Sequence, residues 1–133
     1  MFLDTCFWID LLRERRKKER GRATRMLESL GDTEILISVF VLCELRAGAE
    51  LSQAPRQELT RLSRLVESHP VIYPDSAFAV LYGEVFAALW KNGTPIPVMD
   101  LLVGVTAKRF AMPLLTRDVA HFEKIPGLVV VGY

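Results

Sequence analysis

Four carboxylates lie at the edges of apolar segments in four distant parts of the chain. They are Asp4, Glu44, Asp100 and Asp118. Burying an ionised carboxylate without a partner is costly, so four such placements call for a common explanation. A hard divalent cation such as Mg²⁺ or Mn²⁺ prefers oxygen ligands and neutralises several carboxylates at once. The four acids are therefore candidate metal ligands.

Each of these carboxylates, taken singly, also has a purely structural explanation. Asp4 could cap the helix that follows it, and Asp118 could cap a short helix or turn, because Asp is a favoured N-cap. The third could complement the dipole of a helix in its first turn. Glu44 could form a buried ion pair with Arg46 or Arg117. A shared site is favoured because four acids in similar settings would otherwise need separate explanations.

Short apolar strands alternate with helices along the chain. Strands are expected near residues 1–4, 34–37, 71–73, 113–115 and 128–131. Helices are expected over 5–13, up to about 30 after a basic segment, and over 39–49, 55–67, 76–90 and 97–110. The strands are continuously apolar rather than alternating, which is typical of a parallel sheet covered on both faces. The length fits a single domain over residues 1–133. We therefore predict an α/β fold with a central parallel sheet of about five strands.

This outline predicts that the acids converge. Asp4 and Asp118 follow the carboxyl ends of strands, Glu44 lies on the helix after the second strand, and Asp100 lies in a first helical turn. Ligands of open α/β sheets bind outside the carboxyl ends of the strands. Ionised carboxylates brought together there would raise one another's pKa, and a divalent cation would relieve the repulsion.

Four segments resemble, in order, the motifs of PIN-domain nucleases, and more closely those of VapC-type toxin ribonucleases. They are Leu3–Cys6, Ser38–Gly48, Pro95–Asp100 and Leu115–Asp118, the last followed by Phe122 and Ile125–Leu128. The resemblance covers nearly the whole chain. It implies a PIN-like three-layer sandwich and a Mg²⁺- or Mn²⁺-dependent endoribonuclease. It also implies an RNA substrate, a homodimer and inhibition by a small cognate antitoxin.

The same resemblance assigns roles to individual residues. It implies that the four carboxylates form the metal site and that the hydroxyl of Thr116 helps to hold the site or a water. Cys6 stands where the family often has Asn or Ser, which predicts the loss of a polar contact. Asp118 stands where many toxin members carry Asn, so this chain keeps an acid at that position.

The expected reaction is hydrolysis of an RNA phosphodiester. Glu44 or Asp118 would orient the attacking water or accept its proton. No histidine is assigned to the site, so we do not expect a mechanism in which a histidine activates the 2′-hydroxyl. His121 is near Asp118 in the sequence but is not counted among the ligands.

A basic segment spans residues 13–25. Its candidate RNA-binding residues are Arg13, Arg15, Arg16, Lys17 and Lys18. They could contact phosphates near the crevice. Two other interpretations stay open: an acidic segment of the antitoxin could bind there, or the segment could be a solvated helical face. Glu14 and Lys18 have the favourable i, i+4 order, which supports the solvated face.

Composition narrows the class of protein and suggests where partners bind. The net charge of +1 gives no general signal for nucleic acid. Two cysteines, Cys6 and Cys43, fit small buried apolar positions in a reducing cytoplasm. No membrane span or signal peptide is expected.

The mean hydropathy of +0.22 suggests apolar surface reserved for partners. Helices at residues 7–12, 27–30 and 59–66 could form an antitoxin groove.

Two other functions compete with the ribonuclease. One is a haloacid-dehalogenase-like phosphatase, which also places an Asp after its first strand. That chemistry requires a second acid two residues later, where this chain has Cys6. The other is a non-catalytic PIN-like module that binds RNA or protein. The presence of all four acids argues against that second alternative.

Overall fold

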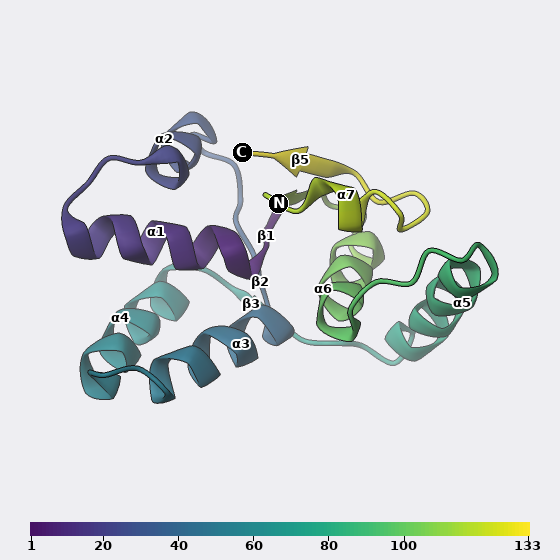
Figure 1. The fold of residues 1–133 in the computed structure, drawn as a ribbon, viewed down its shortest axis with the longest axis horizontal. Helices are drawn as coiled ribbons and strands as arrows, with labels where there is room; N and C mark the ends of the chain where they lie inside the picture. Colours follow the sequence, from purple (N-terminus) through teal and green to yellow (C-terminus); the bar gives the residue numbers. More distant parts are fainter.

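Five short strands and seven helices make up the computed structural model, which describes residues 1–133 (Figure 1). In chain order they are β1 (Phe2–Leu3), α1 (Thr5–Lys17), α2 (Arg22–Ser29), β2 (Ile37–Ser38), α3 (Val39–Glu50), α4 (Pro55–Ser68), β3 (Val71–Ile72), α5 (Phe78–Lys91), α6 (Val98–Arg109), β4 (Leu114–Thr116), α7 (Val119–Phe122) and β5 (Val130–Gly132).

All strand pairs are parallel. One sheet has the order β1-β4-β5, and β2 pairs with β3 in a second. A parallel bridge between Phe2 and Leu36 joins the two, so the strands follow the order β3-β2-β1-β4-β5. The predicted α/β fold with a parallel sheet of about five strands is confirmed. Strands β1 and β4 are neighbours, which brings together the chain segments that follow them.

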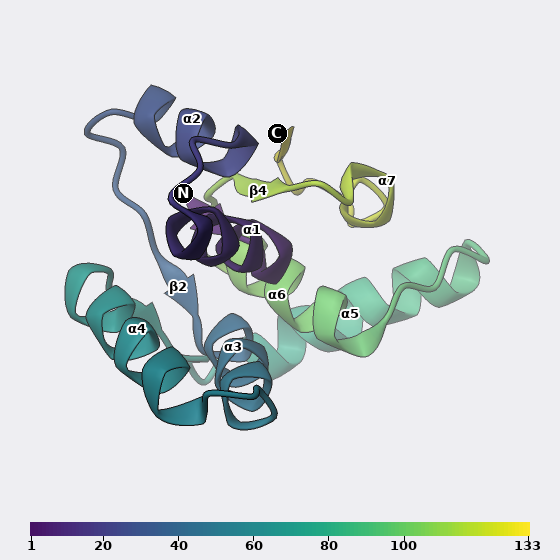
Figure 2. The same cartoon turned by 60° about the vertical axis from the view of Figure 1, so that its left-hand side comes forward.

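The helices surround this sheet. In Figure 1 the first strand lies between α1 on one side and α6 on the other. Helix α3 contacts both α1 and α4, and α5 packs on α6. Figures 1 and 2 both show α5 extending away from the rest of the molecule. None of the helices has the combination of length and apolar character needed to cross a bilayer.

The core lies where α1 meets the sheet. Phe2, Leu3, Phe7 and Trp8 are completely buried. Burying each such side chain contributes about 1.5–3 kcal/mol, so this cluster fixes the start of α1 against the strand that precedes it. Asp4, between the two pairs, is held in place by its neighbours on both sides.

The basic segment is two helices rather than one continuous helical face. Helix α1 ends at Lys17, and its C-cap residue Lys18 has a φ of 57°. The carboxylate of Glu14 then accepts hydrogen bonds from the backbone N–H groups of Ala23 (3.1 Å) and Thr24 (2.8 Å). Glu14 thereby supplies the cap that Gly21 lacks at the start of α2. The expected Glu14–Lys18 pair is wrong, because this capping role occupies the carboxylate.

Two further expectations need correction. Cys43 is exposed rather than buried, and Cys6 is half-buried. The four-residue helix α7 was not among the expected helices, because it is too short to show a 3.6-residue period.

Candidate metal centre

Asp4 is buried at the junction between β1 and α1, with 7% of its surface exposed. It is the N-cap of α1, and its Oδ1 accepts from the backbone N–H of Thr5 at 2.7 Å. Its Oδ2 accepts from the hydroxyl of Thr116 at 2.8 Å and from the thiol of Cys6 at 3.0 Å. The predicted loss of a polar contact at Cys6 is wrong, because the thiol still donates to Asp4.

Thr116 links the two strand ends. It is completely buried, and its Oγ1 donates to Asp4 while accepting from the backbone N–H of Asp118 at 2.9 Å. This hydroxyl therefore fixes the carboxylate that follows β1 relative to the chain that follows β4. Asp118 is the N-cap of α7 but makes no capping hydrogen bond with its side chain. Its half-exposed carboxylate is thus available for another partner.

His121 lies between two of the predicted ligands. Its Nδ1 is 2.9 Å from Oδ2 of Asp118 and 3.3 Å from Oδ2 of Asp100. Carboxylates in the ionised form only accept, so Nδ1 is the donor. Ligand atoms from Asp100, Asp118 and His121 all lie within 4.8 Å of one another. Sequence reasoning left His121 out, although its i+3 spacing from Asp118 on one helix was the available signal.

Asp100 carries the electrostatic signature of crowded carboxylates. Burial and the negative charge of Asp4 raise the pKa of Asp100 above its ordinary value, and Asp118 adds to the effect. The hydrogen bond from His121 opposes this shift. Burial and the charges of Asp4 and Asp118 thus disfavour the ionised form of Asp100, as is expected where carboxylates lie near one another.

Gly104 allows α7 to approach α6 closely enough to complete this site. A Cβ at position 104 would lie 2.3 Å from Cδ1 of Ile125 and 3.2 Å from Cδ1 of Phe122. Both of those side chains are buried. Phe122 of α7 and Ile125, which follows that helix, therefore pack directly on the α6 backbone, one turn beyond Asp100.

Glu44 stands apart from the other three acids but beside the same junction. Its Oε2 accepts from the hydroxyl of Thr5 at 2.5 Å, and Thr5 follows Asp4 directly. The alternative of an ion pair with a nearby arginine is wrong, because Arg46 pairs with Glu50 and Arg117 pairs with Asp10. Glu44 is half-buried and lies outside the three-residue group around His121.

The donor set fits a hard divalent cation. An ionised carboxylate offers about four lone-pair positions, and three of those on Asp4 are occupied by Thr5, Thr116 and Cys6. One position on Oδ1 therefore remains for a ligand. His121 is the one side chain that pairs with the carboxylates of Asp100 and Asp118. A bound cation would stabilise the ionised form of Asp100, whose pKa is raised. Oxygen ligands suit Mg²⁺ and Mn²⁺.

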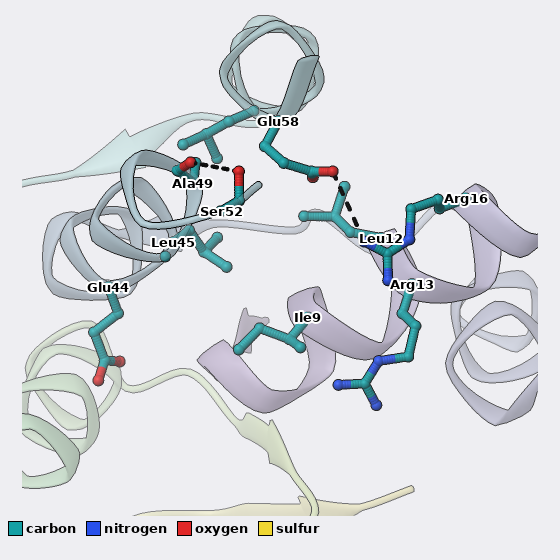
Figure 3. Close-up of a pocket in the computed structure, with 11 residues that line it drawn as sticks. Ile9, Leu12, Arg13, Arg16, Glu44, Leu45, Ala49, Ser52 and Glu58 are labelled. Atoms are coloured by element: carbon teal, nitrogen blue, oxygen red, sulfur yellow. Dashed lines mark hydrogen bonds and ion pairs between the residues drawn. The ribbon is translucent and has the colours of Figure 1, made fainter. Parts of the chain in front are cut away.

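A cavity of about 300 Å³ lies beside Glu44, between α1, α3 and α4. Figure 3 shows Glu44 and Leu45 on one wall and Ile9, Leu12 and Arg13 on the other. Its apolar residues come from α1, α3 and α4. Two of the three helices expected to form an antitoxin groove therefore line the cavity, with α3 in place of the segment at 27–30.

The predicted RNA-binding residues have different partners. Arg13 pairs with Asp10 at 3.4 Å, Arg16 with Glu58 at 3.9 Å and Lys17 with Glu19 at 4.0 Å. Arg15 and Lys18 form no ion pair and are exposed. The segment therefore does not act as a single charged face, since only part of its charge is free to meet a ligand.

Comparisons with known proteins agree with this fold and identify its family. The sequence model of the PIN domain matches residues 1–128. The tRNA(fMet)-specific endonuclease VapC of Salmonella typhimurium is 30% identical over 84% of each chain. Ribonuclease VapC1 of Haemophilus influenzae is 30% identical over 95% of this chain and 92% of the relative. The crystal structure of VapBC2 from Rickettsia felis, bound to a DNA fragment from its promoter, superposes with a TM-score of 0.85. That likeness has 26% identity and covers 99% of this chain and 97% of the other.

Proposed function

Because the chain belongs to the PIN domain family, and within it to the VapC-type ribonucleases, we propose that it is the toxin ribonuclease of a toxin–antitoxin pair. The observation that carries the proposal is the acidic site in which burial and the charges of Asp4 and Asp118 raise the pKa of Asp100. This membership also sets aside the phosphatase alternative, whose required second acid is replaced by Cys6.

The site residues divide into ligands and positioning residues. Asp4, Asp100 and Asp118 would hold Mg²⁺ or Mn²⁺, with Glu44 as a further ligand directly or through water. A divalent cation held there supplies a water of lowered pKa and offsets negative charge that develops on the phosphate. Thr116 is a positioning residue, because its hydroxyl fixes Asp4 and the backbone of Asp118 together.

Glu44 is the best-placed proton acceptor. Like Asp4, it lies outside the group around His121, but its carboxylate accepts one hydrogen bond, from Thr5, whereas that of Asp4 accepts three. A carboxylate that is not fully committed to a cation can accept the proton of an attacking water. Asp118 is the second candidate for this role, because half of its side chain is exposed.

RNA cleavage by the purified protein tests this function. We expect Mg²⁺ or Mn²⁺ to support cleavage of single-stranded RNA and a chelator to reduce the rate about 1,000-fold, which corresponds to about 4 kcal/mol. Adding excess cation should restore the rate. Since water is the proposed nucleophile, product ends should carry no 2′,3′-cyclic phosphate. Cleavage that persists in the chelator, or cyclic phosphate ends, would contradict the proposal.

We further propose that an antitoxin helix occupies the cavity between α1, α3 and α4. Ile9, Leu12, Leu45 and Leu62 offer an apolar lining, and Glu44 at the edge offers a charge for a cationic side chain. An occupant would thus reach the acidic site from the side. Co-purification from the native operon should recover a small partner. Ile9→Arg should release it without changing cleavage of RNA, because Ile9 lines the cavity but is 43% exposed.

We also propose a homodimer that forms through α5. Rings of Phe78, Tyr82, Phe86 and Trp90 stack in series along this helix. Phe86 and Trp90 are 43% and 68% exposed, on a helix that extends away from the molecule (Figure 2). A second copy can present the same aromatic face, as a two-fold interface requires. We also propose that this toxin acts on RNA in the cytoplasm, where Cys6 and Cys43 stay reduced.

The Trp90→Glu variant tests the dimer. It places a charge in the proposed apolar interface, so we expect the dimer to dissociate to monomers at micromolar concentration in analytical ultracentrifugation. Leu51→Glu is the matched control, because Leu51 is 88% exposed on another helix end and should leave the dimer intact. A wild-type monomer, or a Trp90→Glu dimer of unchanged affinity, would rule out this interface.

A further inference from the structure

A second, strongly basic cleft lies between the end of α1 and helix α4, with a volume of about 610 Å³. We call it the basic cleft. Its basic lining residues are Arg15, Arg16, Lys18, Arg61, Arg64 and His69, and its remaining lining residues are Leu12, Leu65 and Ser68. No carboxylate lines it. The cleft combines part of the basic segment with two arginines from a helix about 45 residues further along the chain.

The positive charge of the basic cleft is mostly uncompensated. Glu58 is the one carboxylate that pairs with its cations, at 3.9 Å from Arg16 and in contact with Arg61. Figure 3 shows Arg16 reaching from α1 toward Glu58. Arg15, Lys18 and Arg64 form no ion pair and are exposed. Five permanent cations against one carboxylate repel one another, and an anionic ligand would relieve that repulsion.

The charge continues along α4 rather than stopping at the cleft. Arg56 lines an adjoining depression together with Arg61 and Arg64, and that depression also has no acid. A row of cations suits a polyanion with regularly spaced charges, such as a nucleic-acid strand, better than a single small anion. The cations stand above an apolar floor formed by Leu12 and Leu65.

Helix α1 connects this cleft to the acidic site. Asp4 caps its first turn and Arg15 lies eleven residues later, which corresponds to about 16 Å along the helix axis. A stacked strand advances about 3.4 Å per nucleotide, so this separation equals about five nucleotides. A strand whose scissile phosphate lies at the acidic site can therefore follow α1 to the cleft.

We propose that the basic cleft binds phosphates of the RNA substrate, about five nucleotides away from the bond that is cleaved. The proposal rests on the proposed ribonuclease function and adds a second contact region to it. Arg15, Lys18 and Arg64 are its free cations, while Glu58 orients Arg16 and Arg61 at the rim. The cleft selects for length, because a substrate must span both regions to use it.

A binding experiment with an inactive variant, which leaves the RNA uncut, tests the cleft. Arg15→Gln/Arg64→Gln is made in the Asp100→Asn background and compared with Asp100→Asn alone by fluorescence anisotropy over a salt series. The probes are labelled single-stranded RNAs of 12 and 4 nucleotides. We expect affinity for the longer RNA to fall about ten-fold and its salt slope to flatten by about 1.4, because two phosphate contacts are lost. The 4-nucleotide RNA should bind equally to both proteins.

Arg25→Gln/Lys91→Gln is the matched control, because it removes two exposed cations of α2 and α5 that form no ion pair and do not line the basic cleft. An equal loss of affinity in this control, or unchanged binding of the 12-nucleotide RNA to the cleft variant, would overturn the proposal. The same outcome follows if RNA binding is unchanged while a 12-residue oligoglutamate peptide loses affinity, since the cleft would then be an acidic-peptide site. Because binding is measured without cleavage, these results are independent of whether the wild-type protein cuts RNA.

Discussion

Replacing Asp100 with asparagine is expected to reduce RNA cleavage about 1,000-fold, a loss of about 4 kcal/mol in transition-state stabilisation, and to leave the fold intact. The amide keeps the shape of the side chain but gives up the negative charge that a cation needs. Asp100 lies in the first turn of α6, where the amide meets no new steric conflict. The initial rate under saturating Mg²⁺ and the circular dichroism spectrum together measure the effect.

Asp32→Asn provides the matched control for this variant. Asp32 is an exposed carboxylate in the turn after α2, away from the acidic site, so its replacement should leave the rate within two-fold of wild type, or about 0.4 kcal/mol. Full activity of Asp100→Asn would show that Asp100 is no ligand. Loss of activity in both variants would instead indicate a general effect of charge.

The same substitution should stabilise the protein when no divalent cation is present. The raised pKa of Asp100 shows that folding disfavours its ionised form, through burial and the charge of Asp4. The penalty is absent below the unfolded pKa of 3.8, grows as pH rises from there to the raised folded value, and is constant above it. Asp100→Asn should therefore unfold at a higher temperature than wild type near neutral pH, by a few degrees for about 1 kcal/mol, and the difference should vanish in acid.

Gly104→Val is expected to be the most destabilising single change near the site, lowering the free energy of unfolding by about 3 kcal/mol. The new side chain would overlap Ile125 and Phe122, which are buried and have little room to move. Helix α7 must then shift away from α6 and carry Asp118 and His121 with it. Denaturant unfolding measures the stability, and the rate of RNA cleavage should fall together with it.

Gly83→Val separates this packing effect from a general cost of valine in a helix. Gly83 is also in a helix, α5, but a Cβ there meets nothing within 4 Å. Its replacement should be neutral or slightly stabilising, by about 0.5 kcal/mol, because glycine is a poor helix former. Equal stability of Gly104→Val and Gly83→Val would show that close contact between α6 and α7 does not support the site.

Patterns along the chain were sufficient for the architecture. Continuous apolar strands separated by helices indicate a parallel sheet, and the structure has one. They also placed Asp4 after β1 and Asp118 after β4. They did not show that β1 and β4 are neighbours, because strand order depends on contacts between segments over 110 residues apart.

Side-chain partners were less accessible to sequence reasoning. The proximity of His121 to Asp100, and of Thr5 to Glu44, depends on how α7 packs on α6 and how α1 packs on α3. The end of α1 was missed for a similar reason. Lys18 adopts a left-handed conformation without the glycine that usually marks a helix end, and Glu14 caps the next helix from nine residues away.

The central claim is that Asp4, Asp100 and Asp118 jointly hold a divalent cation. Crystals grown with Mn²⁺ test it most directly, through anomalous scattering from the ion. The account predicts a single strong peak for an ion next to Asp4 that contacts carboxylate oxygens of Asp100 and Asp118. This peak should be absent in Asp100→Asn. The claim is contradicted if saturating Mn²⁺ gives no peak there and His121 still bridges the two carboxylates.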